Sequence, residues 1–124
     1  MKRILPPSCP MDALLRLLTG PWTIYILWVL SERGPQRFGA LKRAVPGIST
    51  RILTERLRML EQAGVVWRRQ AQTIPPAVTY GLTERGMELR TVLDGLGEIA
   101  RRWQEEGRFG QRAAAAEEVT AISR

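Results

Sequence analysis

The 124-residue sequence contains no histidine and only one cysteine. Without histidine, the common acid-base pairs and Cys/His metal sites cannot form, and one cysteine cannot make an intrachain disulfide. We therefore expect no metal site, no cofactor and no enzyme activity. The chain is 44% hydrophobic, which is enough for one domain with its own core.

Long hydrophobic runs are also missing. The run Trp22–Leu30 is too short to span a bilayer, and Pro6 and Pro7 interrupt the apolar start of the chain well below the length of a signal-peptide core. We therefore expect a cytoplasmic protein without a membrane partner.

Positive charge, by contrast, exceeds negative charge, and this net excess lies in one third of the chain. Residues 33–69 carry nine arginines or lysines and two glutamates, which equals the formal net charge of +7 for the whole sequence. Such a basic block is typical of proteins that bind nucleic acid, because each neutralised phosphate releases condensed counterions. A membrane surface would also attract it, but a membrane-bound helix needs a free apolar face. Nucleic acid is the favoured partner.

Within this block, residues 49–62 have the signals of a capped amphipathic helix. Ser49 can serve as the N-cap, Ile48 and Leu53 stand at the two positions of a hydrophobic staple, and Gly64 can close the C-terminus in a left-handed conformation. An ordinary solvated helix would show the same pattern, but the surrounding charge favours a DNA recognition helix. Its two faces are predicted to be Leu53, Leu57 and Leu60 on the buried side and Arg51, Glu55, Arg58 and Gln62 on the other, with Thr54 at the boundary.

Several short elements precede this helix. Pro10 begins a helix that Gly20 ends, and Pro21 begins a second helix whose residues are apolar nearly all round, so we expect it to be buried. Residues 36–38 can form only an edge strand, and Gly39–Val45 forms a two-turn helix. Two helices joined by a tight Pro46-Gly47 turn predict a helix-turn-helix.

A β-hairpin and a long helix are predicted to follow. Residues 65–82 are rich in β-branched and aromatic residues around a Pro75-Pro76 tip, which indicates the wing of a winged helix. Thr83 can cap a helix that continues to about residue 106 with a narrow apolar stripe. This stripe either folds back on the domain or pairs with a second chain, and its coiled-coil spacing favours a dimer. We expect residues 1–8 and 107–124 to be flexible.

Seven short motifs occur in order and in register, at residues 9–10, 20–23, 37–41, 46–49, 57–61, 75–80 and 82–86. Together they are similar to the HxlR family of bacterial transcriptional regulators, which are relatives of the MarR group. The resemblance covers about residues 9–103, and it implies a homodimeric winged helix, with N- and C-terminal dimerisation helices, that binds palindromic operator DNA, commonly as a repressor. The motifs depart from the family pattern at Thr79, where an acidic residue is usual, and at Gly39-Ala40, where a larger polar residue is usual.

Cys9 is a candidate redox sensor. It directly precedes the proline that begins the first helix, so its sulfur would lie at the positive end of the helix dipole, which favours the reactive thiolate. Some members of the similar family sense oxidants or electrophiles with a cysteine at this position. The alternative is a small hydrophobic side chain that packs at the start of the helix.

The sequence thus predicts a mainly α fold with a small β-hairpin, organised as a winged helix-turn-helix domain over residues 9–106. We interpret the chain as a sequence-specific DNA-binding regulator; the alternative is a winged helix that binds RNA or protein. Expected partners are double-stranded DNA, a second copy of the chain, and an oxidant or small-molecule inducer. The predicted DNA contacts are Arg37, Lys42, Ser49, Thr50, Arg51, Thr54, Arg58, Arg68 and Arg69, and the predicted dimer contacts are Leu14, Leu18, Leu89, Val92, Leu93, Leu96, Ile99 and Trp103.

Overall fold

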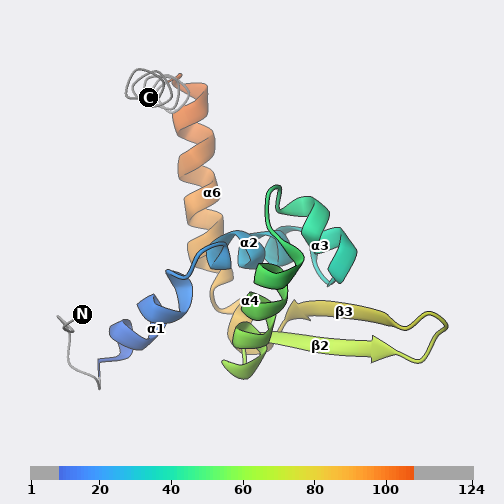
Figure 1. The fold of residues 1–124 in the computed structure, drawn as a ribbon. Coiled ribbons are helices and arrows are strands. Elements are labelled where there is room, and N and C mark those ends of the chain that lie inside the picture. The colour runs from blue at the N-terminus through green and yellow to red at the C-terminus, as the bar shows by residue number, and fades with distance from the viewer. Residues whose placement is uncertain (1–8, 108–124) are drawn as a thin grey trace, which may run out of the picture. The chain divides into compact units, whose positions relative to one another are not determined.

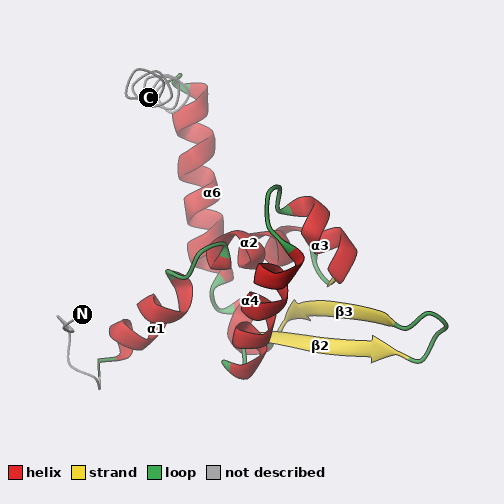
Figure 2. Cartoon of the chain, viewed as in Figure 1, coloured by secondary structure: helices red, strands yellow, loops and turns green. Residues whose placement is uncertain are grey.

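The structure, a computed structural model, describes residues 9–107 (Figure 1). The predicted flexible segments 1–8 and 107–124 lie outside the described residues, except for Gly107. The described part is mainly helical with one small antiparallel sheet, as predicted (Figure 2). The residues up to Leu89 form one compact unit, and those from Arg90 onward form a second one.

Two helices begin the first unit. Helix α1 spans Pro10–Leu18, with Pro10 in its first turn, as predicted. Helix α2 spans Thr23–Arg33, so it begins two residues later than predicted. Trp22 adopts a left-handed conformation (φ 70°), which a right-handed helix cannot include, and it therefore serves as the N-cap. The described residues contain no other non-glycine residue with positive φ.

The predicted helix-turn-helix is present. Helix α3 spans Phe38–Ala44 and helix α4 spans Thr50–Gln62, joined by a turn in which Gly47 has a φ of 90°. The Ser49 hydroxyl accepts a hydrogen bond from the Ile52 backbone N–H at 3.1 Å, which confirms the predicted N-cap. Gly64 has a φ of 79° directly after the helix, which confirms the left-handed C-terminal cap.

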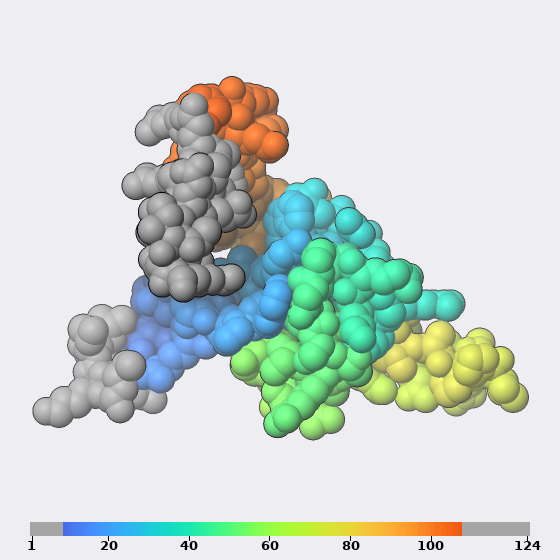
Figure 3. Space-filling view, turned by 45° about the horizontal axis from the view of Figure 1, so that its top comes forward, coloured from blue at the N-terminus to red at the C-terminus, as the bar shows by residue number. Residues whose placement is uncertain are grey.

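A three-stranded antiparallel sheet in the order β1-β3-β2 contains the wing. Strand β1, Gln36–Arg37, pairs with β3 at the sheet edge, as predicted. Strands β2 (Val66–Ala71) and β3 (Ala77–Leu82) pair from Val66 opposite Leu82 to Ala71 opposite Ala77. The hairpin tip, which includes a cis Ile74–Pro75 peptide, projects beyond the helices of this unit, as the yellow atoms in Figure 3 show.

The core of the first unit lies between α2, α3, α4 and the base of the hairpin. Helix α4 contributes Leu53, Leu57 and Leu60, the three leucines assigned to its buried face. Replacing such a buried leucine with alanine typically costs about 2–5 kcal/mol, so this face fixes the rotation of α4 about its axis. The opposite face of α4 is thereby turned to solvent. The remaining large core side chains include Ile26, Leu27, Leu30, Leu41, Val45, Val66 and Tyr80.

The prediction that α2 is buried all round was wrong. Ile26, Leu27, Val29 and Leu30 are buried, but Ile24, Tyr25 and Trp28 are each about 40% exposed. The core covers only one side of the helix, and the exposed aromatic rings contact each other instead, with Tyr25 lying 6.4 Å from both Trp22 and Trp28 between ring centroids. No single helix in residues 9–107 is long and apolar enough to cross a membrane; only the pair α1 and α2 meets that criterion together, and it is bent by 84°.

The single helix predicted from Thr83 to about residue 106 is two helices. Helix α5 spans Glu84–Met87 and helix α6 spans Arg90–Glu105. Thr83 caps α5 as predicted, since its hydroxyl accepts from the Gly86 N–H at 3.1 Å. The helix stops because the backbone N–H groups of Glu88 and Leu89 bond to carbonyls three residues back, at 3.2 and 3.1 Å, instead of continuing the α-helical pattern.

Candidate nucleic-acid interface

The outward face of α4 carries the polar side chains predicted to read DNA. Arg51, Thr54 and Arg58 are all exposed. Arg51 donates from Nε to Glu55 Oε1 at 3.2 Å, and its side chain is 86% exposed. Arg51 and Arg58 therefore extend a planar group with several N–H donors from a rigid helix, which is the geometry that can grip a guanine edge or a phosphate.

Hydroxyl groups at the start of α4 are partly engaged by the helix itself. The Ser49 hydroxyl oxygen accepts a hydrogen bond from the Ile52 N–H, so the first role of this side chain is to cap the helix. Thr54 donates to the Thr50 carbonyl at 2.7 Å, which fixes its hydroxyl against the backbone. Thr50 and Thr54 are both exposed, so the Thr54 methyl group is available for an apolar contact such as that with a thymine methyl.

Further cations lie on the elements that precede α4. Arg37 is exposed at the end of β1, directly before α3, and Lys42 is exposed on α3. Arg43, which was not among the predicted contacts, is exposed beside Lys42. Leu41 turns inward from the same helix, so the two cations are held on its solvent side. These residues widen the basic surface beyond α4.

The wing presents its two predicted arginines on opposite faces. Neighbouring residues in a strand point to opposite sides, and in the observed register Arg68 lies opposite Tyr80 whereas Arg69 lies opposite Thr79. Arg68 donates to the Gln70 side-chain oxygen at 3.5 Å. The Arg69 guanidinium carbon lies 4.8 Å from the centroid of the Trp67 ring. The two arginines are therefore not equivalent.

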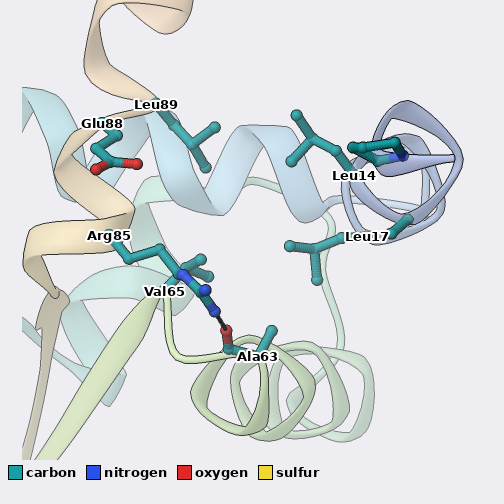
Figure 4. Close-up of a pocket in the computed structure, with 9 residues that line it drawn as sticks. Leu14, Leu17, Ala63, Val65, Arg85, Glu88 and Leu89 are labelled. Atoms are coloured by element: carbon teal, nitrogen blue, oxygen red, sulfur yellow. Dashed lines mark hydrogen bonds between the residues drawn. The ribbon is translucent and has the colours of Figure 1, made fainter. Parts of the chain in front are cut away.

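Cys9 is half-buried at the N-cap of α1, where the structure places it as predicted. Its backbone carbonyl accepts hydrogen bonds from the N–H groups of Asp12 and Ala13. The adjacent Pro10 lines an apolar cavity of about 610 Å³ within the first unit (Figure 4). This cavity lies between α1, the end of α4 and α5. Its other lining residues are Ala13, Leu14, Leu17, Ala63, Val65, Arg85, Glu88 and Leu89.

Arg85 and Glu88 are the charged residues in the cavity wall, and Arg85 is tied to α4. It donates from Nη1 to the Ala63 carbonyl at 3.2 Å, across the cavity margin that Figure 4 shows. Ala63 is the C-cap of α4, so α5 is hydrogen-bonded to the end of α4. A molecule in this cavity would therefore contact both α1 and residues that hold α4.

The predicted dimer residues are only partly exposed. Leu14 and Leu18 on α1 are half-buried. On α6, Val92, Leu96 and Trp103 are 58%, 49% and 47% exposed, Ile99 is half-buried and Leu93 is buried. Arg101 forms ion pairs with Glu98 and Glu105 on the same helix, which raise its pKa further above its ordinary value and support the helix. The α6 helix thus carries an exposed apolar stripe beside a charged side.

Sequence reasoning missed two residues that the geometry brings to the interface. Glu55 was assigned to the outward face of α4 but not to the site, although its spacing of four residues from Arg51 is a signal for the observed ion pair. Trp67 was assigned only to the hairpin, and its contact with Arg69 follows from strand alternation. Within residues 9–107 there is no cluster of three or more metal-ligating side chains.

Comparison with known proteins gives a consistent result. Residues 17–108 match the family model described as HxlR-like helix-turn-helix. An HTH-type transcriptional regulator of Synechocystis sp. is 41% identical over 98 residues, which cover 79% of this chain and 72% of that protein. The regulator YkvN of Bacillus subtilis is 36% identical over 89 residues, which cover 72% of this chain and 75% of that protein.

Solved structures share the same winged-helix fold. The redox regulator HypR in its oxidized form is 33% identical, with a TM-score of 0.70, and the match covers 76% of this chain and 96% of that one. The reduced form of the transcriptional regulator YodB from B. subtilis is 35% identical, with a TM-score of 0.64, and the match covers 80% of this chain and 93% of that one. The predicted winged helix is confirmed.

Proposed function

This chain belongs to the HxlR-like helix-turn-helix family of transcriptional regulators, and we propose that it represses transcription by binding a palindromic operator as a homodimer. The observation that carries the proposal is the outward face of α4, where Arg51 and Arg58 extend from a helix capped at both ends. Two copies related by a twofold axis would present two such helices to successive turns of the major groove.

In this proposal the cations divide by role. Arg51 and Arg58 contact base edges, and Thr54 adds an apolar contact beside them. Arg37, Lys42, Arg68 and Arg69 bind phosphates and set the register of the protein on DNA, and Ser49 and Thr50 hold the backbone at the start of α4 close to the phosphates. The excess of positive charge in residues 33–69 supports this division.

A footprint of the purified protein on the DNA upstream of its own gene tests the proposal. We expect a protected palindrome, and we expect Arg51→Ala and Arg58→Ala each to weaken binding to it by about 1–3 kcal/mol while changing the base preference. Arg16→Ala on α1, which removes an exposed arginine paired with Asp12, is the matched control. If Arg51→Ala and Arg58→Ala bind the operator and random DNA as the wild type does, the proposal is wrong.

The alternative is a winged helix that binds RNA or protein. An adaptor that binds protein through α4 would be expected to expose apolar side chains on this face, whereas the exposed residues here are Arg51, Thr54, Glu55, Arg58 and Gln62. A competition assay with duplex RNA of the same sequence distinguishes RNA from DNA. Equal affinity for both duplexes would favour the RNA alternative.

The inducer is the remaining part of the proposal. Cys9 lies at the N-cap of α1, and two solved relatives are a redox regulator in its oxidized form and a regulator in its reduced form. These observations support an oxidant or electrophile that modifies Cys9. The apolar cavity beside Pro10, about 610 Å³ in volume, supports a small apolar molecule instead. Both would act on α1.

A further inference from the structure

Trp67 and Arg69 make a cation–π contact, called the stack below, on one face of the wing. They are two residues apart on β2, so their side chains leave the same side of the hairpin. The guanidinium carbon of Arg69 lies 4.8 Å from the centroid of the Trp67 ring. A cation within about 6 Å of an indole centroid is attracted by the negative face of the ring.

Gly81 makes room for this stack. It is the residue directly opposite Trp67 on β3. A Cβ atom at position 81 would lie 2.3 Å from Cζ2 and 2.5 Å from Cε2 of the Trp67 ring, which no side chain can accommodate. The indole therefore lies across the bare backbone of Gly81, and any other residue there would displace it. The ring is half-buried as a result.

The stack restrains Arg69 without neutralising it. The ring attracts the guanidinium through its π face, so the N–H groups of Arg69 are not used up in a hydrogen bond to it and remain able to donate. Within the part of the chain that the structure describes, Arg69 takes part in no ion pair. The sequence also has no acidic residue between Gln62 and Thr83, so the whole wing is without negative charge.

We propose that Trp67 is a positioning residue: supported by Gly81, it holds the Arg69 guanidinium ready to donate to a DNA phosphate from the wing. This inference rests on the proposed function, because the phosphate is that of the bound DNA. A long arginine side chain loses rotamer freedom when it binds, and a restraint that exists before binding reduces this loss. Arg68, on the other face of the same strand, donates to the Gln70 side chain instead, and it serves as the internal comparison.

A double-mutant cycle tests the inference. Affinity for the operator is measured by fluorescence anisotropy for the wild type, Trp67→Ala, Arg69→Ala and the double variant, at several salt concentrations. We expect Trp67→Ala to weaken binding about two- to five-fold per wing, in line with an exposed cation–π contact. In the Arg69→Ala background the same change is expected to have no further effect. Arg69→Ala alone is expected to weaken binding more and to lower the salt dependence.

Three further variants separate positioning from general structure. Trp67→Phe keeps an aromatic face and is expected to retain most of the affinity, whereas Trp67→Leu keeps bulk alone and is expected to resemble Trp67→Ala. Gly81→Ala keeps both the Trp67 and the Arg69 side chain in the protein, but its methyl group displaces the indole. It is therefore expected to weaken binding as Trp67→Ala does. The matched cycle with Arg68→Ala is expected to be additive. Circular dichroism verifies that each variant is folded.

The outcomes separate the two proposals. A wild-type protein that binds no DNA overturns the proposed function and this inference with it. If the wild type binds but Trp67→Ala weakens binding equally in the Arg69 and Arg69→Ala backgrounds, only the positioning role is wrong. The same conclusion follows if Trp67→Leu binds as well as Trp67→Phe, since the aromatic face would then be irrelevant. Should Trp67→Ala unfold, the cycle with Trp67→Leu gives the same answer.

Discussion

Arg51 and Glu55 form an ion pair one helical turn apart on the outward face of α4, with Nε and Oε1 separated by 3.2 Å. Both side chains are at least half exposed, so the pair adds little to the stability of the helix. The ion pair matters for DNA binding instead, because it places the Glu55 carboxylate on a surface that would face the negatively charged DNA. In the proposed complex Glu55 would repel phosphates, and it holds one donor of Arg51.

We therefore predict that Glu55→Gln binds random DNA more tightly and discriminates less between operator and random DNA. Glutamine removes the repulsion and releases Arg51 from its fixed partner, so contacts to wrong sequences become less costly. Anisotropy titrations on both DNAs measure the ratio. Glu61→Gln, the same charge change on another face of α4, is the control. If the two variants have equal effects, Glu55 has no special role.

The α4 segment shows how far sequence reasoning reaches. Its two ends depend on local rules, namely a serine at the N-cap and a glycine after the C-terminus, and both features are observed. Its rotation follows from the spacing of Leu53, Leu57 and Leu60, which are buried as predicted. All of these determinants lie within a few residues of one another, and local determinants can be read from a single sequence.

A second prediction concerns Gly86, which lies against the start of β2. A Cβ at this position would lie 2.1 Å from the Val65 backbone oxygen, which cannot move away as a flexible side chain could. We expect Gly86→Ala to lower the free energy of unfolding by about 1–3 kcal/mol, because the crowding forces backbone shifts. Urea denaturation followed by circular dichroism measures the change.

Gly95 provides the opposite case. It lies within α6, and a Cβ there would meet nothing within 4 Å in the described structure. Gly95→Ala should therefore raise the stability by about 0.5–1 kcal/mol through helix propensity alone.

A Gly86→Ala variant as stable as the wild type would contradict the prediction for Gly86, because the chain would then be able to move at the contact between Gly86 and the Val65 oxygen.

The break between α5 and α6 could not be predicted from the sequence. Thr83 signals the start of a helix correctly, and the apolar spacing continues through Leu89 without a proline. The residues of α5 are held by tertiary contacts: Gly86 is packed against the Val65 carbonyl, and Arg85 bonds to the Ala63 carbonyl, while the bonds of Glu88 and Leu89 to carbonyls three residues back end the helix. Such contacts join residues about 20 positions apart, and periodicity carries no information on them.

The third prediction is that the protein is a dimer that the α6 stripe helps to form. Val92, Leu96 and Trp103 are exposed apolar side chains on one helix, and covering them would remove them from water. Light scattering after gel filtration should give twice the chain mass. Val92→Glu should shift it toward the monomer, because it would place a charge in an apolar contact.

Thr91→Glu is the matched control, since it adds the same charge at a neighbouring exposed position of α6. It should remain dimeric. A wild type that is monomeric at micromolar concentration would refute the dimer. If both glutamate variants remain dimeric, the dimer forms through another surface.

The wing shows a different limit of sequence reasoning. The sequence predicts its strands, and pairs of residues on one face follow from alternation once the register is known. The register itself depends on where the turn falls, and only the observed pairing puts Gly81 opposite Trp67. The sequence shows Trp67, Arg69 and Gly81, but it does not predict that the Trp67 indole lies over Gly81 and supports Arg69.

The last prediction concerns Cys9. If it is a sensor, a diamide-type oxidant should change the operator affinity of the wild type and leave Cys9→Ser unaffected. The thiol lies at the start of α1, and the next residue lines the cavity that α1 shares with the end of α4, so a modified sulfur can shift the packing that holds the recognition helix. A modification moves such an equilibrium only if it favours one of the two states. Because the chain has one cysteine, no other thiol can account for the response. Equal responses from the two proteins, or none from either, would show that Cys9 packs as a small hydrophobic side chain and would favour a ligand in the cavity.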